Sequence, residues 1–157
     1  MTDSPHRTRV LFLCTGNSCR SQMAEGWTRH LHGDRIDACS AGTNPQGLNP
    51  LAARVMEEAG VDISGGASKA VEACDPETLD VVVTVCGHAH ETCPVFPGGT
   101  RVVHRGFDDP PRLAADAQTE EAALPHYRRV RDEIRAYVGA LPELLESLRG
   151  NEKATTR

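Results

Sequence analysis

Short hydrophobic runs alternate with amphipathic segments along this chain. Residues 9–14 are a β-rich apolar run that stops at Thr15-Gly16-Asn17, which is typical of a strand buried on both faces that enters a loop. From residue 20 to 32, apolar side chains recur every four residues, so this segment predicts a helix with one buried stripe, and Gly33 ends it. The first unit is therefore strand, loop and helix.

The same alternation continues along the chain. Residues 36–40 predict a strand, and Asn49-Pro50 places an N-cap before a proline at the first position of a helix over 51–60. Residues 80–86 give the clearest strand, because 81–85 are all β-branched, and 101–104 predict a shorter one.

The last segment, 125–148, carries a helical stripe of apolar residues that Pro142 should kink or restart. Residues 1–8 and 150–157 are expected to be a flexible N-terminus and a flexible tail, and 9–149 to form the domain. Strands that alternate with helices predict an α/β fold, with a parallel sheet and helices on both faces. A chain of 157 residues, 39% hydrophobic, suits a single three-layer domain and is too short for two ordinary ones.

The net charge and the length of the apolar runs exclude several classes of function. The formal net charge is −5, from 17 Lys and Arg against 22 Asp and Glu, so we expect no nucleic-acid partner and no anionic membrane surface. The longest apolar runs fall far short of the ~20 residues that span a bilayer, and the first eight residues are polar. We therefore expect a cytoplasmic protein in which any anion site is local.

The chain has six cysteines, which a cytoplasmic domain of this size should keep as thiols. They lie at positions 14, 19, 39, 74, 86 and 93. Cys39 and Cys74 have no evident partner, and we interpret both as buried or incidental thiols.

The candidate chemistry lies at 14–21, CTGNSCRS, between the first strand and the first helix. Backbone N–H groups and the helix dipole favour an anion there, and glycine and asparagine tolerate the left-handed dihedrals of a tight loop. Arg20 adds a planar fork that fits a tetrahedral oxyanion. Such a field lowers the pKa of a thiol at the mouth of the loop, which predicts that Cys14 is a thiolate nucleophile, whereas Cys19 fits a packed thiol better.

The sequence closely resembles the thioredoxin-coupled arsenate reductases, which share the fold of low-molecular-weight protein tyrosine phosphatases. The resemblance covers about residues 9 to 140, in order and with family spacing. The segments that carry it are FLCTGNSCRSQMAEGW at 12–27, SAG at 40–42, VTVC at 83–86, CP at 93–94, GFDDP at 106–110 and RVRDEI at 129–134.

The resemblance implies a four-stranded sheet of order 2-1-3-4 and reduction of arsenate to arsenite. It places the nucleophile on Cys14, the oxyanion-binding arginine on Arg20, the thiolate-stabilising serine on Ser21, the resolving cysteines on Cys86 and Cys93, and the general acid on Asp109. The substrate-binding loop falls on Thr15, Gly16, Asn17, Ser18, Cys19 and Arg20. Phosphate and sulfate are the expected competing oxyanions, thioredoxin is the expected electron donor, no bound cofactor is expected, and we expect a monomer.

Two of these roles also follow from chemistry. Expelling an oxygen from arsenate benefits from a nearby carboxylic acid, and Asp109, directly before Pro110, fits this role. The resemblance aligns the acid directly before the first proline, which makes Asp108 the weaker candidate. Cys86 ends the strongest strand, at the same sheet edge as Cys14, and Cys93 follows after six residues, so a thiol-disulfide relay is geometrically reasonable. A short helix between Cys86 and Cys93 would have to rearrange as the relay proceeds.

Two alternatives stay open. A phosphatase of the same scaffold would use the same cysteine and arginine, although six aromatic residues leave little to build a phosphotyrosine slot. A zinc or arsenite-binding module would use Cys86, His88, His90 and Cys93, although their spacing is unlike that of structural zinc sites.

A metal cofactor is a separate question. Some members of the family bind potassium through residues that match Asn17, Glu25 and Ser40, but Lys69 stands where an aspartate usually completes that site. An ammonium group there would occupy the place of the cation, which argues against potassium activation. Arg105 stands where relatives often carry tryptophan. Its charge either raises the local concentration of oxyanions near the site or is an inert surface charge.

Overall fold

The computed structural model is described here for residues 7–91, 93–96 and 99–155. At its centre is one parallel sheet in the order β2-β1-β3-β4. The strands are β1 (Thr8–Cys14), β2 (Ile36–Gly42), β3 (Val81–Thr84) and β4 (Arg101–His104). The predicted strand order and the single-domain α/β architecture are confirmed.

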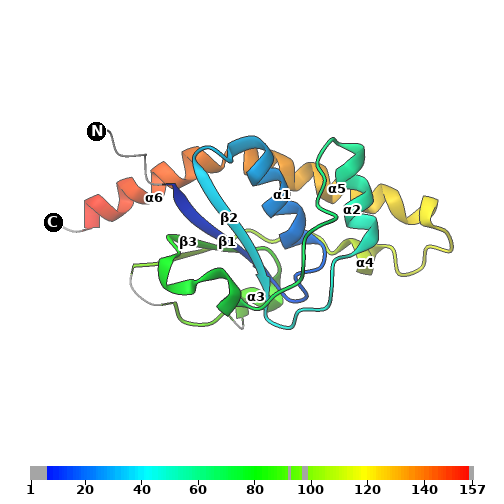
Figure 1. Ribbon diagram of the computed structural model, residues 1–157, viewed down its shortest axis with the longest axis horizontal. Helices are drawn as coiled ribbons and strands as arrows, with labels where there is room; N and C mark the ends of the chain where they lie inside the picture. Colours follow the sequence, from blue (N-terminus) through cyan, green and yellow to red (C-terminus); the bar gives the residue numbers. More distant parts are fainter. Residues whose placement is uncertain (1–6, 92, 97–98, 156–157) are drawn as a thin grey trace.

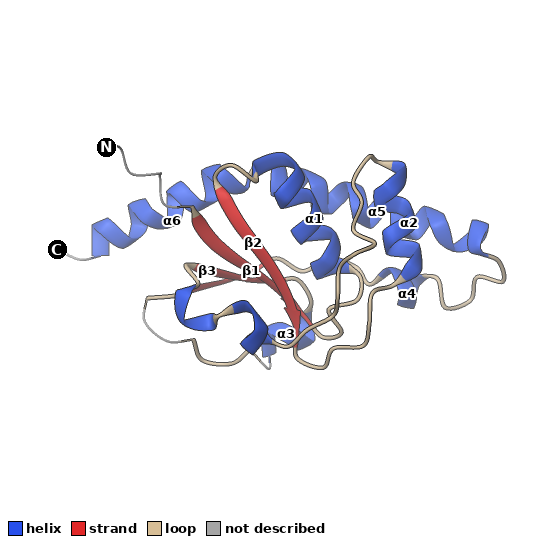
Figure 2. Ribbon diagram, in the orientation of Figure 1, coloured by secondary structure: helices blue, strands red, loops and turns tan. Residues whose placement is uncertain are grey.

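Helices cover both faces of this sheet (Figures 1 and 2). They are α1 (Arg20–His32), α2 (Pro50–Glu58), α3 (Gly87–Glu91), α4 (Pro110–Leu113), α5 (Glu120–Gly139) and α6 (Leu141–Thr155), with 3₁₀ turns η1 (Val71–Cys74) and η2 (Pro76–Thr78). Helix α1 packs against α5 and β2, and α2 packs against α5, while η1 contacts β2 and α3 contacts β1 and β3. Figure 2 shows α1 and α5 on one side of the strands and α3 on the other.

The two central strands form the core because their side chains are apolar on both faces. Val10, Leu11, Phe12 and Leu13 of β1 are inaccessible to solvent, and every residue of β3 is buried. Strand β4 instead alternates between half-buried and exposed positions, as an edge strand does. All four strands run parallel, so their carboxyl ends meet at one edge of the sheet.

The C-terminal helices differ from the prediction at both ends. Helix α5 begins at Glu120, five residues before Pro125, because the Thr119 hydroxyl accepts a hydrogen bond from the Ala122 N–H and caps the helix. The helix breaks at Ala140, next to Pro142, so the expected restart is confirmed. Helix α6 then runs to Thr155, past the start of the predicted tail at residue 150. Strand β1 likewise includes Thr8, one residue before the predicted domain start.

The prediction for Cys39 and Cys74 is wrong, because the two residues form a disulfide bond. Cys39 lies in β2 and Cys74 ends η1, and their Cα atoms are 6.2 Å apart, within the usual range for such bonds. The expectation of free thiols came from the presumed compartment, whereas the pairing comes from the packing of η1 on β2. In the described part of the chain, no helix is long and apolar enough to cross a membrane.

Candidate active site

A cleft of about 580 Å³ opens at the carboxyl edge of the sheet. Cys14, the last residue of β1, lies at this edge beside its register partner Gly42 on β2. The lining residues are Cys14, Thr15, Gly16, Ser18, Cys19, Arg20, Gln46, Cys86, Gly87, Asp109, Pro111 and Arg112. The structure therefore brings together Cys14, Arg20, Cys86 and Asp109, which lie as far as 95 residues apart in the sequence.

The Cys14 sulfur is the end point of a buried chain of hydrogen bonds. Asn17 Nδ2 donates to the Ser21 hydroxyl oxygen at 2.9 Å, and the same hydroxyl lies 2.9 Å from Cys14 Sγ. Because Asn17 already supplies a proton to the Ser21 oxygen, the Ser21 proton is free to point at sulfur. A donated hydrogen bond favours a thiolate over a thiol, so the arrangement suits the nucleophile that the sequence predicts.

Arg20 and Asp109 face the same part of the cleft. Arg20 is fixed by a 2.9 Å hydrogen bond from Nη1 to the Phe107 carbonyl oxygen, and its Nη2 lies 3.6 Å from Asp109 Oδ1. The Arg20 side chain is 14% exposed and that of Asp109 39%. Asp109 thus lies at the solvent side of the cleft, where an acid can reach an oxygen of an anion bound to Arg20.

Asp108, the weaker candidate for the acid, has a different neighbour. Its carboxylate accepts a 3.0 Å hydrogen bond from Arg129 of α5, and it does not line the cleft. The choice of Asp109 over Asp108, which the sequence supports only through the following proline, agrees with this geometry.

Cys19 and Cys86 are both buried but differ in their surroundings. Cys19 begins α1 as its N-cap residue, and burial strongly raises the pKa of its thiol, so this sulfur stays protonated. Cys86 follows β3, and its sulfur lies 3.4 Å from the Thr15 hydroxyl and accepts a 3.3 Å hydrogen bond from the Ala89 N–H. Cys86 therefore lines the wall of the cleft next to the Cys14 loop.

Cys93 lies outside the cleft lining, beyond the short helix α3. Its thiol is partly buried, and desolvation raises its pKa. Two residues later, the Val95 side chain is 98% exposed, which makes it the most exposed large hydrophobic residue in the described part of the chain. A single exposed apolar side chain is common on protein surfaces, so Val95 shows only that the chain near Cys93 faces solvent.

The sequence does not indicate which residues hold Asn17 in place. Asn17 has a φ of 46° and is fully buried, so its side chain supports the loop rather than lining the cleft. The Ser68 hydroxyl donates to the Asn17 carbonyl oxygen at 2.6 Å, and the Lys69 N–H donates to Asn17 Oδ1 at 2.9 Å. No motif marks Ser68, or the cleft residues Gln46 and Arg112, because they come from segments without a regular pattern.

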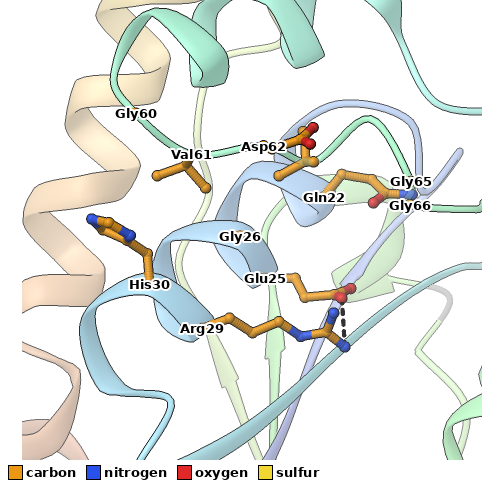
Figure 3. A pocket seen from close by; sticks show the side chains of 11 residues that line it. Gln22, Glu25, Gly26, Arg29, His30, Gly60, Val61, Asp62, Gly65 and Gly66 are labelled. Carbon is orange, nitrogen blue, oxygen red and sulfur yellow. Dashed lines mark ion pairs between the residues drawn. The ribbon is translucent and has the colours of Figure 1, made fainter.

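A second hollow, of about 440 Å³, lies on α1 away from the cleft (Figure 3). Its wall carries the ion pair between Glu25 and Arg29, at 2.8 Å. Glu25 also accepts a short hydrogen bond from the Ser40 hydroxyl, and the Lys69 ammonium lies 3.8 Å from the same Glu25 oxygen. Glu25, Ser40 and Lys69 thus form a cluster in which the cation is a lysine of the chain itself.

The sequence of this domain matches the model of one known protein family. The model of the low molecular weight phosphotyrosine protein phosphatases matches residues 9–154. The chain belongs to this family. Among curated proteins, it is 48% identical over 125 residues to an arsenate reductase of Halalkalibacterium halodurans, and 47% identical over 125 residues to an arsenate reductase of Bacillus subtilis. Both alignments cover 80% of this chain and 88% of the relative.

Solved structures of the phosphatase family agree with the fold. An arsenate reductase in the phosphate binding state has a TM-score of 0.65 and 33% sequence identity, covering 85% of this chain and 95% of that one. The low molecular weight protein tyrosine phosphatase of T. tengcongensis has a TM-score of 0.67 and 26% identity, covering 87% of this chain and 98% of that one. The phosphatase fold thus carries two chemistries among the relatives.

Proposed function

We propose that this protein is an arsenate reductase. The observation that carries the proposal is a second cysteine, Cys86, in the wall of the cleft that holds Cys14, Arg20 and Asp109. A phosphatase needs one nucleophilic cysteine, whereas a reductase needs a second thiol to take up the oxidation. The curated relatives named above, at 47–48% identity, are arsenate reductases.

The first half of the reaction uses the loop and the acid. Arsenate binds to the loop N–H groups and to the Arg20 fork, with phosphate and sulfate as competitors. The Cys14 thiolate attacks arsenic, the arsenic–oxygen bond opposite breaks, and Asp109 gives the departing oxygen its proton so that it leaves as water. The product is an adduct with a sulfur–arsenic(V) bond.

The second half reduces arsenic through sulfur. The Cys86 thiolate attacks Cys14 Sγ, a Cys14–Cys86 disulfide forms, and the electron pair of the broken sulfur–arsenic bond stays on arsenic, which leaves as arsenite. Cys93 then attacks Cys86, which releases the Cys14 thiolate and forms a Cys86–Cys93 disulfide. Arsenic gains two electrons and one dithiol loses two, so the cycle balances.

Helix α3 must open for Cys86 and Cys93 to meet. It spans only Gly87–Glu91, and a helix this short gains little stability from its own hydrogen bonds. The Ala89 N–H bond to Cys86 Sγ is lost when this sulfur reacts, which removes a contact at the start of the helix. A short helix between the two thiols is what the relay needs, and it agrees with the sequence-based expectation.

A thioredoxin is the proposed electron donor, and the cytoplasm the proposed compartment. The Cys86–Cys93 disulfide would move the oxidation from the cleft to Cys93, which is only partly buried and lies outside the cleft lining, so a protein dithiol could attack it there. We further propose that the enzyme acts as a monomer.

Potassium activation is not expected, because the Lys69 ammonium already lies 3.8 Å from Glu25 and a second cation there would be repelled. The measured activity should then be the same in potassium and tetramethylammonium salts of equal ionic strength. A severalfold activation by potassium alone would contradict this assignment.

The same cleft also suits a phosphomonoesterase, and the family match favours this as a second candidate. No aromatic side chain is among the described residues that line the cleft, so it has no obvious platform for a phosphotyrosine ring. The zinc alternative involves His88, whose side chain lies outside the described residues; within them, no three His, Cys, Asp or Glu side chains are arranged to hold a metal ion. Metal analysis of the reduced protein tests it.

The deciding experiment is arsenate-dependent NADPH oxidation with thioredoxin and thioredoxin reductase. Wild type should turn over, and Cys14→Ser should be inactive while remaining folded, because a hydroxyl cannot form the disulfide. Cys86→Ser should lose arsenate reduction but keep slow hydrolysis of a phosphate ester, which separates the two candidates. Absence of arsenate-dependent oxidation by wild type refutes the proposal.

Disulfide mapping after one turnover tests the order of the relay. Wild type should carry Cys86–Cys93, and Cys93→Ser should trap Cys14–Cys86. A bond from Cys14 to Cys19 or to a small external thiol would contradict a thioredoxin relay.

A further inference from the structure

The Cys39–Cys74 disulfide has no part in the proposed relay, because neither cysteine lines the cleft. Its two cysteines are 35 residues apart in the sequence, and the bond joins the edge strand β2 to the turn η1. The stretch between α2 and η1, residues 59–70, is fully described and contains no helix or strand. This stretch therefore has no backbone ladder of its own to hold it on the sheet.

The end of that stretch is tied to β2 at two places. The Gly42 N–H donates to the Lys69 carbonyl oxygen at 2.8 Å, and five residues after Lys69 the disulfide fixes Cys74 to Cys39. Cys74 is 1% exposed and Cys39 is half-buried, so one of the two sulfur atoms belongs to a fully buried residue. Together the two ties set the position of Ser68 and Lys69 relative to the sheet.

Ser68 and Lys69 in turn both act on one residue, Asn17. They bind its carbonyl oxygen and its Oδ1, at 2.6 and 2.9 Å. Asn17 has a φ of 46°, a left-handed conformation that asparagine tolerates better than most residues, and the two bonds hold it in this conformation. With Oδ1 held by Lys69, Nδ2 points at Ser21, and Ser21 points at Cys14.

We propose that the Cys39–Cys74 disulfide is a positioning crosslink for the active-site loop, a role that rests on the proposed function but acts before any chemistry. It holds Ser68 and Lys69 against Asn17, and so keeps the Ser21 hydroxyl on the Cys14 sulfur. Cys39 and Cys74 are positioning residues, because neither contacts the cleft. Reducing this bond with a dithiol takes two electrons and two protons, gives two thiols and leaves the dithiol as a cyclic disulfide.

The test compares wild type with the double variant Cys39→Ser/Cys74→Ser. The rate at which iodoacetamide alkylates Cys14 is measured against pH, with the modified residue located by peptide mapping. Because the thiolate is the form that reacts and a donated hydrogen bond favours it, partial loss of the Ser21 hydrogen bond should lower the alkylation rate at neutral pH severalfold and move the midpoint of the profile upward. Protection of Cys14 by inorganic phosphate should need a severalfold higher phosphate concentration.

Two further variants separate positioning from general stability. Ser68→Ala keeps the disulfide but removes one bond to Asn17, and should move the midpoint in the same direction by a smaller amount. Val138→Ala truncates a buried residue of α5 whose carbonyl contacts His32, at the far end of α1 from the loop. It should lower the melting temperature and leave the alkylation profile unchanged.

The outcomes are distinct from those that test arsenate reduction, because alkylation and phosphate protection involve no turnover. Wild type that has not turned over, with Cys86 and Cys93 reduced, should show four reactive thiols after denaturation, matching the four free cysteines. Six thiols, or a double variant that is folded and keeps the wild-type midpoint and phosphate protection, would overturn the proposal. If the double variant does not fold, the Ser68→Ala profile decides: an unchanged midpoint overturns the proposal and an upward shift supports it.

Discussion

Replacing Gly42 by alanine should disturb the active-site loop through a direct clash. A Cβ at this position would lie 2.6 Å from the Thr15 carbonyl oxygen and 2.8 Å from the Asn17 N–H nitrogen. Both contacts are with backbone atoms of the loop, so no side-chain rotation relieves them. Overpacking of this kind costs about 1–3 kcal/mol of unfolding free energy, which for a chain of this size lowers the melting temperature by roughly 2–4 °C per kcal/mol.

The effect on activity should exceed the effect on stability. The loop is tied to the following segment by N–H bonds from Thr43 to the Cys14 carbonyl and from Asn44 to the Thr15 carbonyl, so it cannot move freely away from the new methyl group. A displacement near 1 Å of groups that position a substrate costs about 10²-fold in rate. We therefore expect Gly42→Ala to lower kcat/KM for arsenate by about 10²-fold.

The matched control is Gly139→Ala at the end of α5, where an added Cβ meets nothing within 4 Å. In a helix this change removes chain entropy from the unfolded state and should stabilise the protein by up to about 1 kcal/mol. Its kcat/KM should equal that of wild type. Coupled NADPH oxidation and thermal unfolding measure both variants, and a Gly42→Ala protein with wild-type activity would refute the steric reasoning.

Three other predictions concern the cleft. Arg20→Lys should lose most arsenate reduction in the coupled assay, because a point ammonium cannot hold two oxygens as the guanidinium fork does; near-normal turnover would mean that another cation binds the substrate. Asp109→Asn should slow single-turnover arsenite formation by about 10²–10⁴-fold, with a smaller effect for Asp108→Asn, whose wild-type carboxylate pairs with Arg129; the reverse ranking would assign the acid to Asp108. Cys19 should resist iodoacetamide at neutral pH in the folded protein, because burial raises its pKa and the thiol stays protonated; rapid labelling of Cys19 by mass spectrometry would contradict this.

The parts of the fold that follow from sequence are those with local patterns. The run at 9–14 predicts β1 within one residue, because a strand buried on both faces needs uninterrupted apolar side chains. The loop at 14–21 predicts an anion site, because its glycine, asparagine and arginine stand between that strand and a helix start. The start of α5 at Glu120 was missed because Pro125 resembles a first helical residue, whereas Thr119 is the actual cap.

The parts that do not follow are contacts between segments without a pattern. Nothing near Cys39 or Cys74 marks them as partners, since 35 residues and an irregular stretch separate them. No local pattern marks Ser68 and Lys69 as partners of Asn17 either. Such contacts depend on how the chain crosses the sheet edge, which only tertiary packing decides.

The Cys39–Cys74 crosslink also affects which disulfide of this protein a reductant can reach. A thiolate must approach a disulfide along the line of its two sulfur atoms, and here the approach through Cys74, which is 1% exposed, is closed, whereas Cys39 is half-buried. Cys93 is partly exposed and stands beside the most exposed apolar side chain of the described chain. The two dithiol pairs thus present their half-buried sulfurs on different elements, Cys39 on the edge strand β2 and Cys93 after α3, so reduction of one pair does not require access to the other.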